Sequence, residues 1–111
     1  MGKQTKTDLL QGMLDLLVLR ALSPGPLNGW DVMQRLQLIS GDVLRVIPGS
    51  LYPALHRLET RGLVEADWGA SENNRRAKFY KLTPAGRKQL EKEMKTWKRF
   101  SGAVELILRD A

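Results

Sequence analysis

The apolar positions of the chain begin with a stretch in which almost every residue is hydrophobic. Ten of the fourteen positions in residues 9–22 are apolar: Leu9, Leu10, Met13, Leu14, Leu16, Leu17, Val18, Leu19, Ala21 and Leu22. This pattern predicts a helix that starts at a Thr7–Asp8 cap and stops at Ser23-Pro-Gly-Pro26. A helix that is apolar all round must be covered all round. In so small a protein we expect a second chain to supply part of that cover.

Two shorter helices are predicted next. The first runs from Trp30 to Leu38 or Ile39, and its inner face is Val32, Met33, Leu36 and Ile39. Residues 43–47 are predicted to be short and extended. The other helix covers about residues 51–61, and we expect Ser50 to cap its exposed amides. Its inward positions are Leu51, Leu55 and Leu58, and Gly62 is suited to end it.

Residues 62–82 have the pattern of two strands joined by a polar turn. The strands are predicted over residues 62–69 and 77–82, and Asn73-Asn74 between them tolerates the left-handed backbone of a tight turn. Three cations stand at the tip and far side of this turn: Arg75, Arg76 and Lys78. A two-stranded ribbon with a cationic tip, preceded by a helix, is the geometry of a DNA-binding wing.

The last predicted helix starts at Thr83-Pro84 and continues to about Arg109, interrupted only by Gly102. Its apolar seam has the 4-3-4-3-4 spacing of a helix that packs along another helix: Leu90, Met94, Trp97, Ser101, Val104 and Leu108. About 25 helical residues span about 37 Å. A domain of about 80 residues cannot cover that length, so we expect much of the seam to contact a second subunit.

These elements predict a mainly α fold with a small β-wing. We expect a winged helix-turn-helix DNA-binding domain over residues 1–82 and a C-terminal dimerisation helix over residues 83–111. The 111 residues leave no room for a second independent core.

Charge adds a location to this picture. The net charge is +6, but residues 75–99 hold ten cations and two anions, so this segment carries +8 and the remainder −2. Such local basicity favours a surface that meets a polyanion. A solvated helix face explains Lys88, Lys92 and Lys95, but it explains the cations of the wing less well.

The residue inventory argues against an enzyme. The chain has one histidine, no cysteine, no Gly-rich phosphate-binding motif and no spacing of His, Asp and Glu suited to a metal. We therefore expect neither catalysis nor a cofactor. No apolar run approaches the roughly 20 residues of a membrane span, and the absence of cysteine does not indicate an oxidising compartment. A cytoplasmic location is the expectation.

Three segments of the chain resemble the PadR family of transcriptional regulators. They are Leu14-Asp-Leu-Leu-Val-Leu-Arg-Ala-Leu22, Pro48-Gly-Ser-Leu-Tyr-Pro-Ala-Leu-His-Arg-Leu-Glu-Thr-Arg-Gly-Leu63 and Arg75-Arg-Ala-Lys-Phe-Tyr-Lys-Leu-Thr-Pro-Ala-Gly86. The short length is similar to the subgroup with a single C-terminal dimerisation helix. The resemblance implies a homodimeric repressor bound to a palindromic DNA operator.

Candidate DNA contacts come from the third helix and the wing. The outward positions of the helix are Ser50, Tyr52, Pro53, His56 and Arg57. Tyr52 matches a family tyrosine that the resemblance implies contacts DNA. An exposed lone histidine is often silent, and Arg57 could instead form a surface ion pair. The wing supplies Asn74, Arg75, Arg76 and Lys78, of which at least one cation is expected to brace the sheet. Six phosphate contacts per dimer predict a salt slope near −5, from about −0.9 for each contact.

The dimer interface is expected to combine Leu10, Leu14 and Leu17 with the seam of the last helix. Trp97 lies in mid-seam and has two interpretations. One is an ordinary interface anchor; the other, implied by the resemblance to multidrug-sensing relatives, is a platform that stacks a small planar aromatic effector against its mate. Trp30 and Trp68 are expected to pack in the core.

Two other functions remain open for a winged helix. A protein–protein interaction module would not need cations at the wing tip. A sequence-independent DNA-binding protein would share those cations but would lose its DNA to random competitor.

Overall fold

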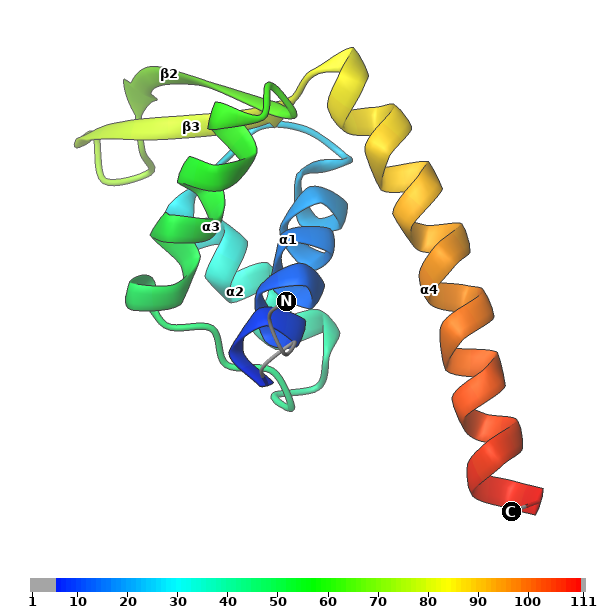
Figure 1. The fold of residues 1–111 in the computed structure, drawn as a ribbon. Coiled ribbons are helices and arrows are strands. Elements are labelled where there is room, and N and C mark those ends of the chain that lie inside the picture. The colour runs from blue at the N-terminus through cyan, green and yellow to red at the C-terminus, as the bar shows by residue number, and fades with distance from the viewer. Residues whose placement is uncertain (1–5, 111) are drawn as a thin grey trace.

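The computed structural model describes the backbone of residues 6–110 and the side chains of residues 11–110. The elements follow in the order α1 (Lys6–Leu22), β1 (Leu27–Asn28), α2 (Gly29–Ile39), α3 (Pro48–Thr60), β2 (Val64–Ala70), β3 (Arg76–Leu82) and α4 (Pro84–Asp110). In Figure 1, α1, α2 and α3 form a bundle beneath the sheet, and α4 leads away from it. The predicted fold class is confirmed: a winged helix-turn-helix with a long C-terminal helix.

The sheet is antiparallel, with β3 between β1 and β2. The ribbon of β2 and β3 runs from Val64 opposite Leu82 to Ala70 opposite Arg76. Its turn is closed by the Ser71 amide, which donates to the Arg75 carbonyl at 2.8 Å. Asn74 has a φ of 56°, the left-handed conformation that asparagine tolerates better than most residues. The prediction of a hairpin at this point is confirmed.

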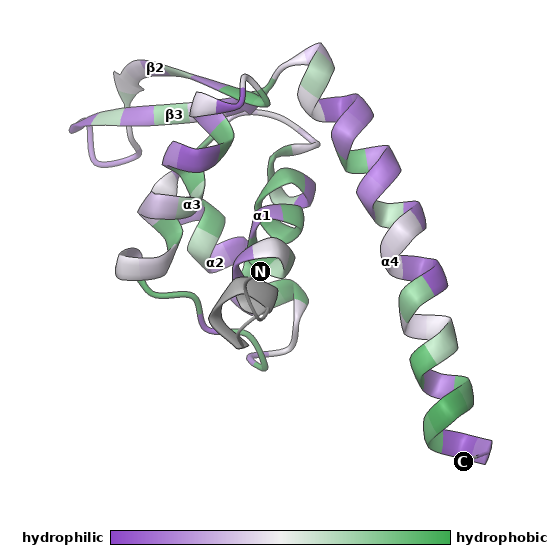
Figure 2. Ribbon diagram, viewed as in Figure 1, coloured by the Kyte–Doolittle hydropathy of each residue, from purple (hydrophilic) through white to green (hydrophobic). Residues whose placement is uncertain are grey.

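The core lies between the three bundled helices and the sheet. Its fully buried side chains include Leu19 and Leu22 of α1, and the predicted inward residues of α3 are all buried: Leu51, Leu55 and Leu58. Val32, Met33 and Leu36 form the buried face of α2. Figure 2 shows hydrophobic segments, in green, along α1, α2 and α3. The helix α3 ends at Thr60 with Arg61 as its C-cap, and Gly62 has a φ of 73°, as its predicted role requires.

Several local predictions are wrong. Helix α1 begins by Lys6, so the predicted Thr7–Asp8 cap lies inside it. Helix α3 begins at Pro48 with Ile47 as its N-cap, so Ser50 is within the first turn and caps nothing. Proline has no amide hydrogen to satisfy and suits the first helical position, so the helix starts earlier than the serine suggested. Residues 43–47 form a loop, and the third strand is β1 instead.

Three apolar side chains predicted to be inside lie at the surface. Ile39 is 75% exposed because α2 ends there and its buried face stops at Leu36. Trp30 and Trp68 are 63% and 60% exposed, so neither belongs to the core. These three residues were predicted to be inside from the spacing of apolar positions. Spacing indicates which face of an element is apolar, but not where along the element the core ends.

The start of α4 is bound tightly to the wing's base. The Thr83 hydroxyl donates to the Gly62 carbonyl at 2.7 Å and accepts from the Gly86 amide at 3.0 Å. A Cβ at Gly86 would collide with the carbonyl oxygen of Leu63, so only glycine permits this approach. Leu90, one turn further, is buried at 6% exposure. Beyond it, the helix extends away from the bundle in a molecule 54 Å long. No helix within residues 6–110 is long and apolar enough to cross a membrane.

Candidate nucleic-acid interface

The first half of α3 presents an uncovered face. Ser50, Pro53 and His56 are exposed, and Tyr52 is 47% exposed. The Tyr52 ring lies directly over Gly29 at the start of α2, where an added Cβ would stand 2.5 Å from the phenolic oxygen. The same helix start is capped by Asn28, whose side-chain oxygen accepts from the Asp31 amide at 2.8 Å. The tyrosine is thus held between two helix starts with one side open.

Arg57 is engaged inside the protein. Its Nη2 lies 2.8 Å from Oδ1 of Asp15 in α1, and its Nε lies 3.4 Å from Oδ2. Asp15 is 8% exposed, whereas the Arg57 side chain keeps 32% of its surface open. The ion pair that the sequence left open for Arg57 therefore exists, but with a buried partner 42 residues away rather than with a neighbour on α3. This arrangement indicates a role in fixing α3 against α1.

The wing cations divide into two groups. Arg75 and Arg76 are exposed at the turn and the start of β3. Lys78 is held between the wing and α3: its Nζ lies 3.6 Å from Oε1 of Glu59 and 5.6 Å from the centroid of the Tyr80 ring. Since Lys78 is the cation that braces the ribbon, the free positive charge of the wing comes from the two arginines.

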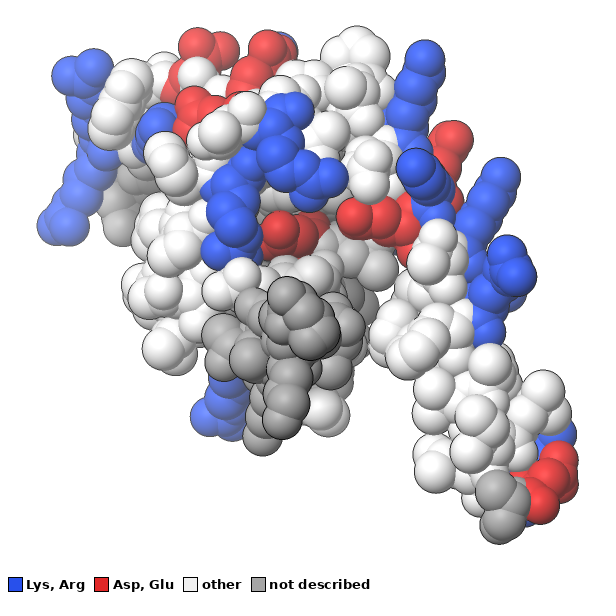
Figure 3. Space-filling view, viewed as in Figure 1, with Lys and Arg blue, Asp and Glu red and all other residues white. Residues whose placement is uncertain are grey.

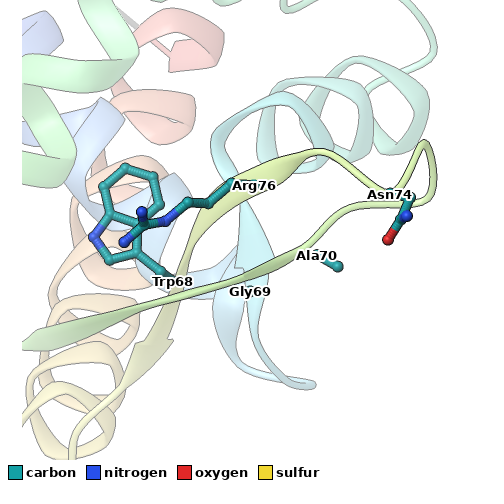
Figure 4. Close-up of a pocket in the computed structure, with 5 residues that line it drawn as sticks. All are labelled: Trp68, Gly69, Ala70, Asn74 and Arg76. Carbon is teal, nitrogen blue, oxygen red and sulfur yellow. The ribbon is translucent and has the colours of Figure 1, made fainter.

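Arg76 is stacked on Trp68. The guanidinium carbon lies 4.7 Å from the centre of the indole ring, across the ribbon from β3 to β2. Figure 4 shows Arg76 folded back over Trp68, with Asn74 at the turn, around a shallow concavity lined by Trp68, Gly69, Ala70, Asn74 and Arg76. The spacing of apolar residues did not reveal this pair, because a cation and a tryptophan on neighbouring strands leave no periodic signal.

Burial also changes the properties of Tyr80 behind this surface. Its side chain is 6% exposed. Removal from water raises the pKa of the phenol above its usual value of 10.0, while the nearby Lys78 ammonium partly opposes the rise and Glu59 adds to it. Tyr80 is therefore a neutral part of the core at physiological pH.

The surface charge follows the wing and the last helix. Figure 3 shows Lys and Arg side chains at the free end of the wing and along α4. The exposed cations of α4 are Arg87, Lys88, Lys92, Lys95, Lys98, Arg99 and Arg109. One of them, Arg87, reaches the bundle and donates to the Ser23 carbonyl at 3.2 Å. In the part of the chain that the structure describes, no three His, Cys, Asp or Glu side chains form a metal-binding group.

The predicted seam of α4 is split by the structure. Leu90 belongs to the domain's own core, at 6% exposure. Met94, Trp97 and Leu108 are exposed, whereas Ser101 and Val104 are half-buried. Phe100 was missed: its ring lies 5.9 Å from that of Trp97 and is 59% exposed. Its position three residues after Trp97 was the available signal.

On α1, two residues predicted for the interface are half-buried. Leu14 and Leu17 pack against the edge of the core. Leu10, the third, has a side chain outside the described residues. Met13, the residue before Leu14, is 40% exposed. The second half of α1 is covered by its own chain, so less of this helix needs an external partner than its composition suggested.

Comparison with known proteins gives a consistent result. Residues 18–92 match the model of the transcriptional regulator PadR-like family. The chain is 44% identical over 89 residues to an uncharacterized 37.1 kDa protein in a transposon of Streptomyces fradiae; the match covers 80% of this chain and 24% of that protein, so the chain spans about a quarter of this relative. It is 37% identical over 68 residues to a transcriptional regulator of Mycobacterium tuberculosis, covering 61% of this chain and 63% of that one.

Solved structures of similar fold cover nearly the whole chain. A PadR-like transcription factor from Bacteroides fragilis is 30% identical with a TM-score of 0.78, over 95% of this chain and 99% of that one. A PadR-like transcriptional regulator from Bacillus cereus is 28% identical with the same TM-score, over 93% and 98%.

Proposed function

The chain belongs to the PadR-like family of transcriptional regulators, and from this premise we propose that it is a homodimeric repressor of a palindromic operator. The observation that carries the proposal is the uncovered face of α3 beside a cationic ribbon tied to it by the Glu59–Lys78 contact. A helix enters the major groove, and a flanking basic ribbon neutralises phosphates or reaches the minor groove.

The division of labour on α3 follows from what each side chain contacts. Ser50, Tyr52, Pro53 and His56 are open to a ligand, and they are the residues we assign to the DNA. Arg57 is assigned to the support of the helix because Asp15 holds its guanidinium. Asn74, Arg75 and Arg76 form the outer part of the proposed contact, and Lys78 positions the wing.

A second subunit accounts for the exposed apolar end of α4. The helix has 27 residues, and the large apolar side chains left open on it are Met94, Trp97, Phe100, Leu106, Ile107 and Leu108. Side chains of this size are normally removed from water, and a stripe of them on a helix is suited to a partner helix. We propose residues 83–111, together with the first half of α1, as the dimerisation region, and residues 1–82 as the DNA-binding domain.

The two copies would place their α3 helices in successive major grooves, about 34 Å apart. Binding there blocks access of the transcription machinery, which is the proposed route to repression. Release requires an effector that binds the two arrangements of the dimer differently. Trp97 with Phe100 supplies aromatic surface for a small planar effector at the dimer centre.

The test is an anisotropy titration against the DNA upstream of the protein's own gene, with random competitor and a salt series. We expect binding that resists competitor. Because Lys78 is engaged by Glu59, two free wing arginines per subunit make four phosphate contacts, and the slope of log K against log salt should be about −3.6 rather than −5. A slope near −1 contradicts the proposal.

Charge reversal separates this function from the two alternatives. Replacing both Arg75 and Arg76 by Glu should abolish operator binding. The double variant Arg61→Glu with Lys81→Glu makes the same change of charge outside the proposed DNA contacts and the dimerisation region, and should leave binding largely intact. Protein-partner binding that survives the wing reversal would favour an interaction module. Binding that random competitor removes would favour a sequence-independent DNA-binding protein.

A further inference from the structure

The face of the wing that continues from the core carries an unusual pair of side chains. Along β3, alternate residues on this face are Leu82, Tyr80, Lys78 and Arg76, and their partners on β2 are Val64, Ala66, Trp68 and Ala70. Leu82 and Tyr80 are buried, the Lys78 side chain is 39% exposed, and Arg76 is exposed. The ribbon therefore leaves the core at the level of the paired residues Lys78 and Trp68.

Trp68 does not pack in the core; its side chain contacts Arg76 instead. The residue directly opposite it is Lys78, which Glu59 draws toward α3. The diagonal position is Arg76, whose guanidinium lies 4.7 Å from the centre of the indole. A tryptophan that is 60% exposed gains little from packing in the folded monomer. Its visible contribution is a flat surface on which the arginine rests.

Stacking changes what Arg76 can do. A guanidinium laid on an indole loses part of its rotational freedom and part of its hydration before any ligand arrives, so less of each is lost on binding. Its five N–H donors stay in one plane, and the face away from Trp68 remains open. Arginine held in this manner is suited to the narrow minor groove of A·T-rich DNA, where the negative potential is enhanced.

We propose that Trp68 is a positioning residue that holds Arg76 for the minor groove beside each half-site, so that the pair gives the protein a preference for A·T-rich flanks. This inference rests on the proposed DNA-binding function. Arg75 lies in the turn, and Lys78 is engaged by α3, so Arg76 is the wing cation with a prepared orientation.

The experiment begins with selection of preferred duplexes from a random library by the wild-type protein. Base pairs that flank the selected half-sites are then changed between A·T and G·C, and both dissociation constants are measured by anisotropy. The ratio is the dissociation constant with G·C flanks divided by that with A·T flanks. The variants are Trp68→Phe, Trp68→Ala and Arg76→Lys, and the matched control is Arg61→Lys, at an exposed arginine outside the proposed contact. Far-ultraviolet circular dichroism verifies that each variant is folded; the exposure of Trp68 makes folding of its variants the expected result.

We expect the wild-type to prefer A·T flanks. Arg76→Lys keeps the charge but should reduce the ratio about fivefold, and Trp68→Ala should reduce it by about two- to fivefold, as expected for one exposed cation–π contact. Trp68→Phe should fall between Trp68→Ala and the wild-type, because phenylalanine is the weaker cation–π partner. Arg61→Lys should leave the ratio unchanged.

The other outcomes are distinct. An unchanged ratio in Trp68→Ala, with a reduced ratio in Arg76→Lys, overturns the role of Trp68. Unchanged ratios in both overturn the minor-groove assignment while operator binding stands. A wild-type protein that selects no sequence at all removes the proposed function, and this failure is seen before any variant is measured.

Discussion

The carboxylate of Asp15 in α1 binds the guanidinium of Arg57 in α3, with Oδ1 and Nη2 2.8 Å apart. Removing either partner leaves a charge in a largely buried position without its mate. We expect Asp15→Ala to lower the free energy of unfolding by about 2–3 kcal/mol and Arg57→Ala to do at least as much, because Asp15 is the more buried of the two.

The double variant Asp15→Leu with Arg57→Met is the informative control for this pair. Replacing a buried ion pair by apolar side chains of similar size is often neutral or stabilising. Urea denaturation should therefore place the double variant closer to wild-type than either alanine variant. Losses that simply add would show that the two side chains act independently.

A second prediction concerns the junction of α4 with the wing. Gly86→Ala introduces a Cβ that collides with the Leu63 carbonyl oxygen, so α4 must move away from the wing's base. We expect a loss of about 2 kcal/mol or more of unfolding free energy, as for other overpacked sites.

The matched control lies in the same helix. A Cβ at Gly102 meets nothing within 4 Å. Gly102→Ala should therefore stabilise the helix by about 0.5–1 kcal/mol. Thermal denaturation followed by circular dichroism measures both changes, and equal effects at the two glycines would contradict the close contact at Gly86.

The packing of Tyr52 over Gly29 gives a third prediction. Gly29→Ala should push the tyrosine ring aside, since the nearest atoms to the added methyl group are the far end of that side chain. If Tyr52 contacts DNA as proposed, Gly29→Ala and Tyr52→Ala should both weaken operator binding by about tenfold, on the order of 1.4 kcal/mol. The two losses should not add in the double variant, and full affinity in Gly29→Ala would remove Tyr52 from the interface.

Tyr80 makes the stability depend on alkaline pH. Its pKa is raised chiefly by burial, so the folded protein resists ionisation of the phenol more than the unfolded chain does. The contribution to stability is complete below about pH 10, the usual pKa of tyrosine, and is lost as the pH rises through the higher pKa of the folded protein. Urea midpoints of the wild-type and Tyr80→Phe, measured from pH 8 to 11, should differ in slope only above about pH 10. Parallel curves throughout would contradict the shift.

Phe100 tests the proposed dimer. Phe100→Ala removes an exposed ring beside Trp97 and should raise the dimer dissociation constant at least about tenfold, the effect of a modest interface anchor. Thr96→Ala, one turn earlier and also exposed, is the control and should change the constant little. Sedimentation equilibrium at several concentrations distinguishes the two. A wild-type chain that stays monomeric at every concentration contradicts the dimer itself.

The sequence predicted the elements whose signals are local. Leu51, Leu55 and Leu58 share a helix face by spacing alone, and the Asn73-Asn74 turn and Gly62 depend on backbone conformations that few residues adopt. Ser50 misled because a cap residue competes with the proline two positions earlier for the helix start, and the proline prevails.

Long-range relationships were not accessible to the same reasoning. The partner of Arg57 is 42 residues away, and nothing in the spacing of either residue indicates the other. Trp68 alternates correctly with the core-facing residues of β2, but alternation continues unchanged past the point where the core ends. Trp68 stacks on Arg76 because β2 extends past the end of the core. The pair could be recognised only once the register of the two strands was known.

The hydrogen bonds of Thr83 to Gly62 and Gly86 join the start of α4 directly to the base of the wing, so that a change in the tilt of α4 is transmitted to the wing. The helix is about 40 Å long at 1.5 Å per residue. A tilt of about 10° at this junction therefore moves the far end of α4 by about 7 Å, which is about the rise of two base pairs. Conversely, a small displacement between two α4 helices at their far ends would rotate the whole proposed DNA-binding domain. In a dimer joined through α4, contacts at the far ends of these helices would adjust the distance between the two DNA-binding domains without contacting the DNA.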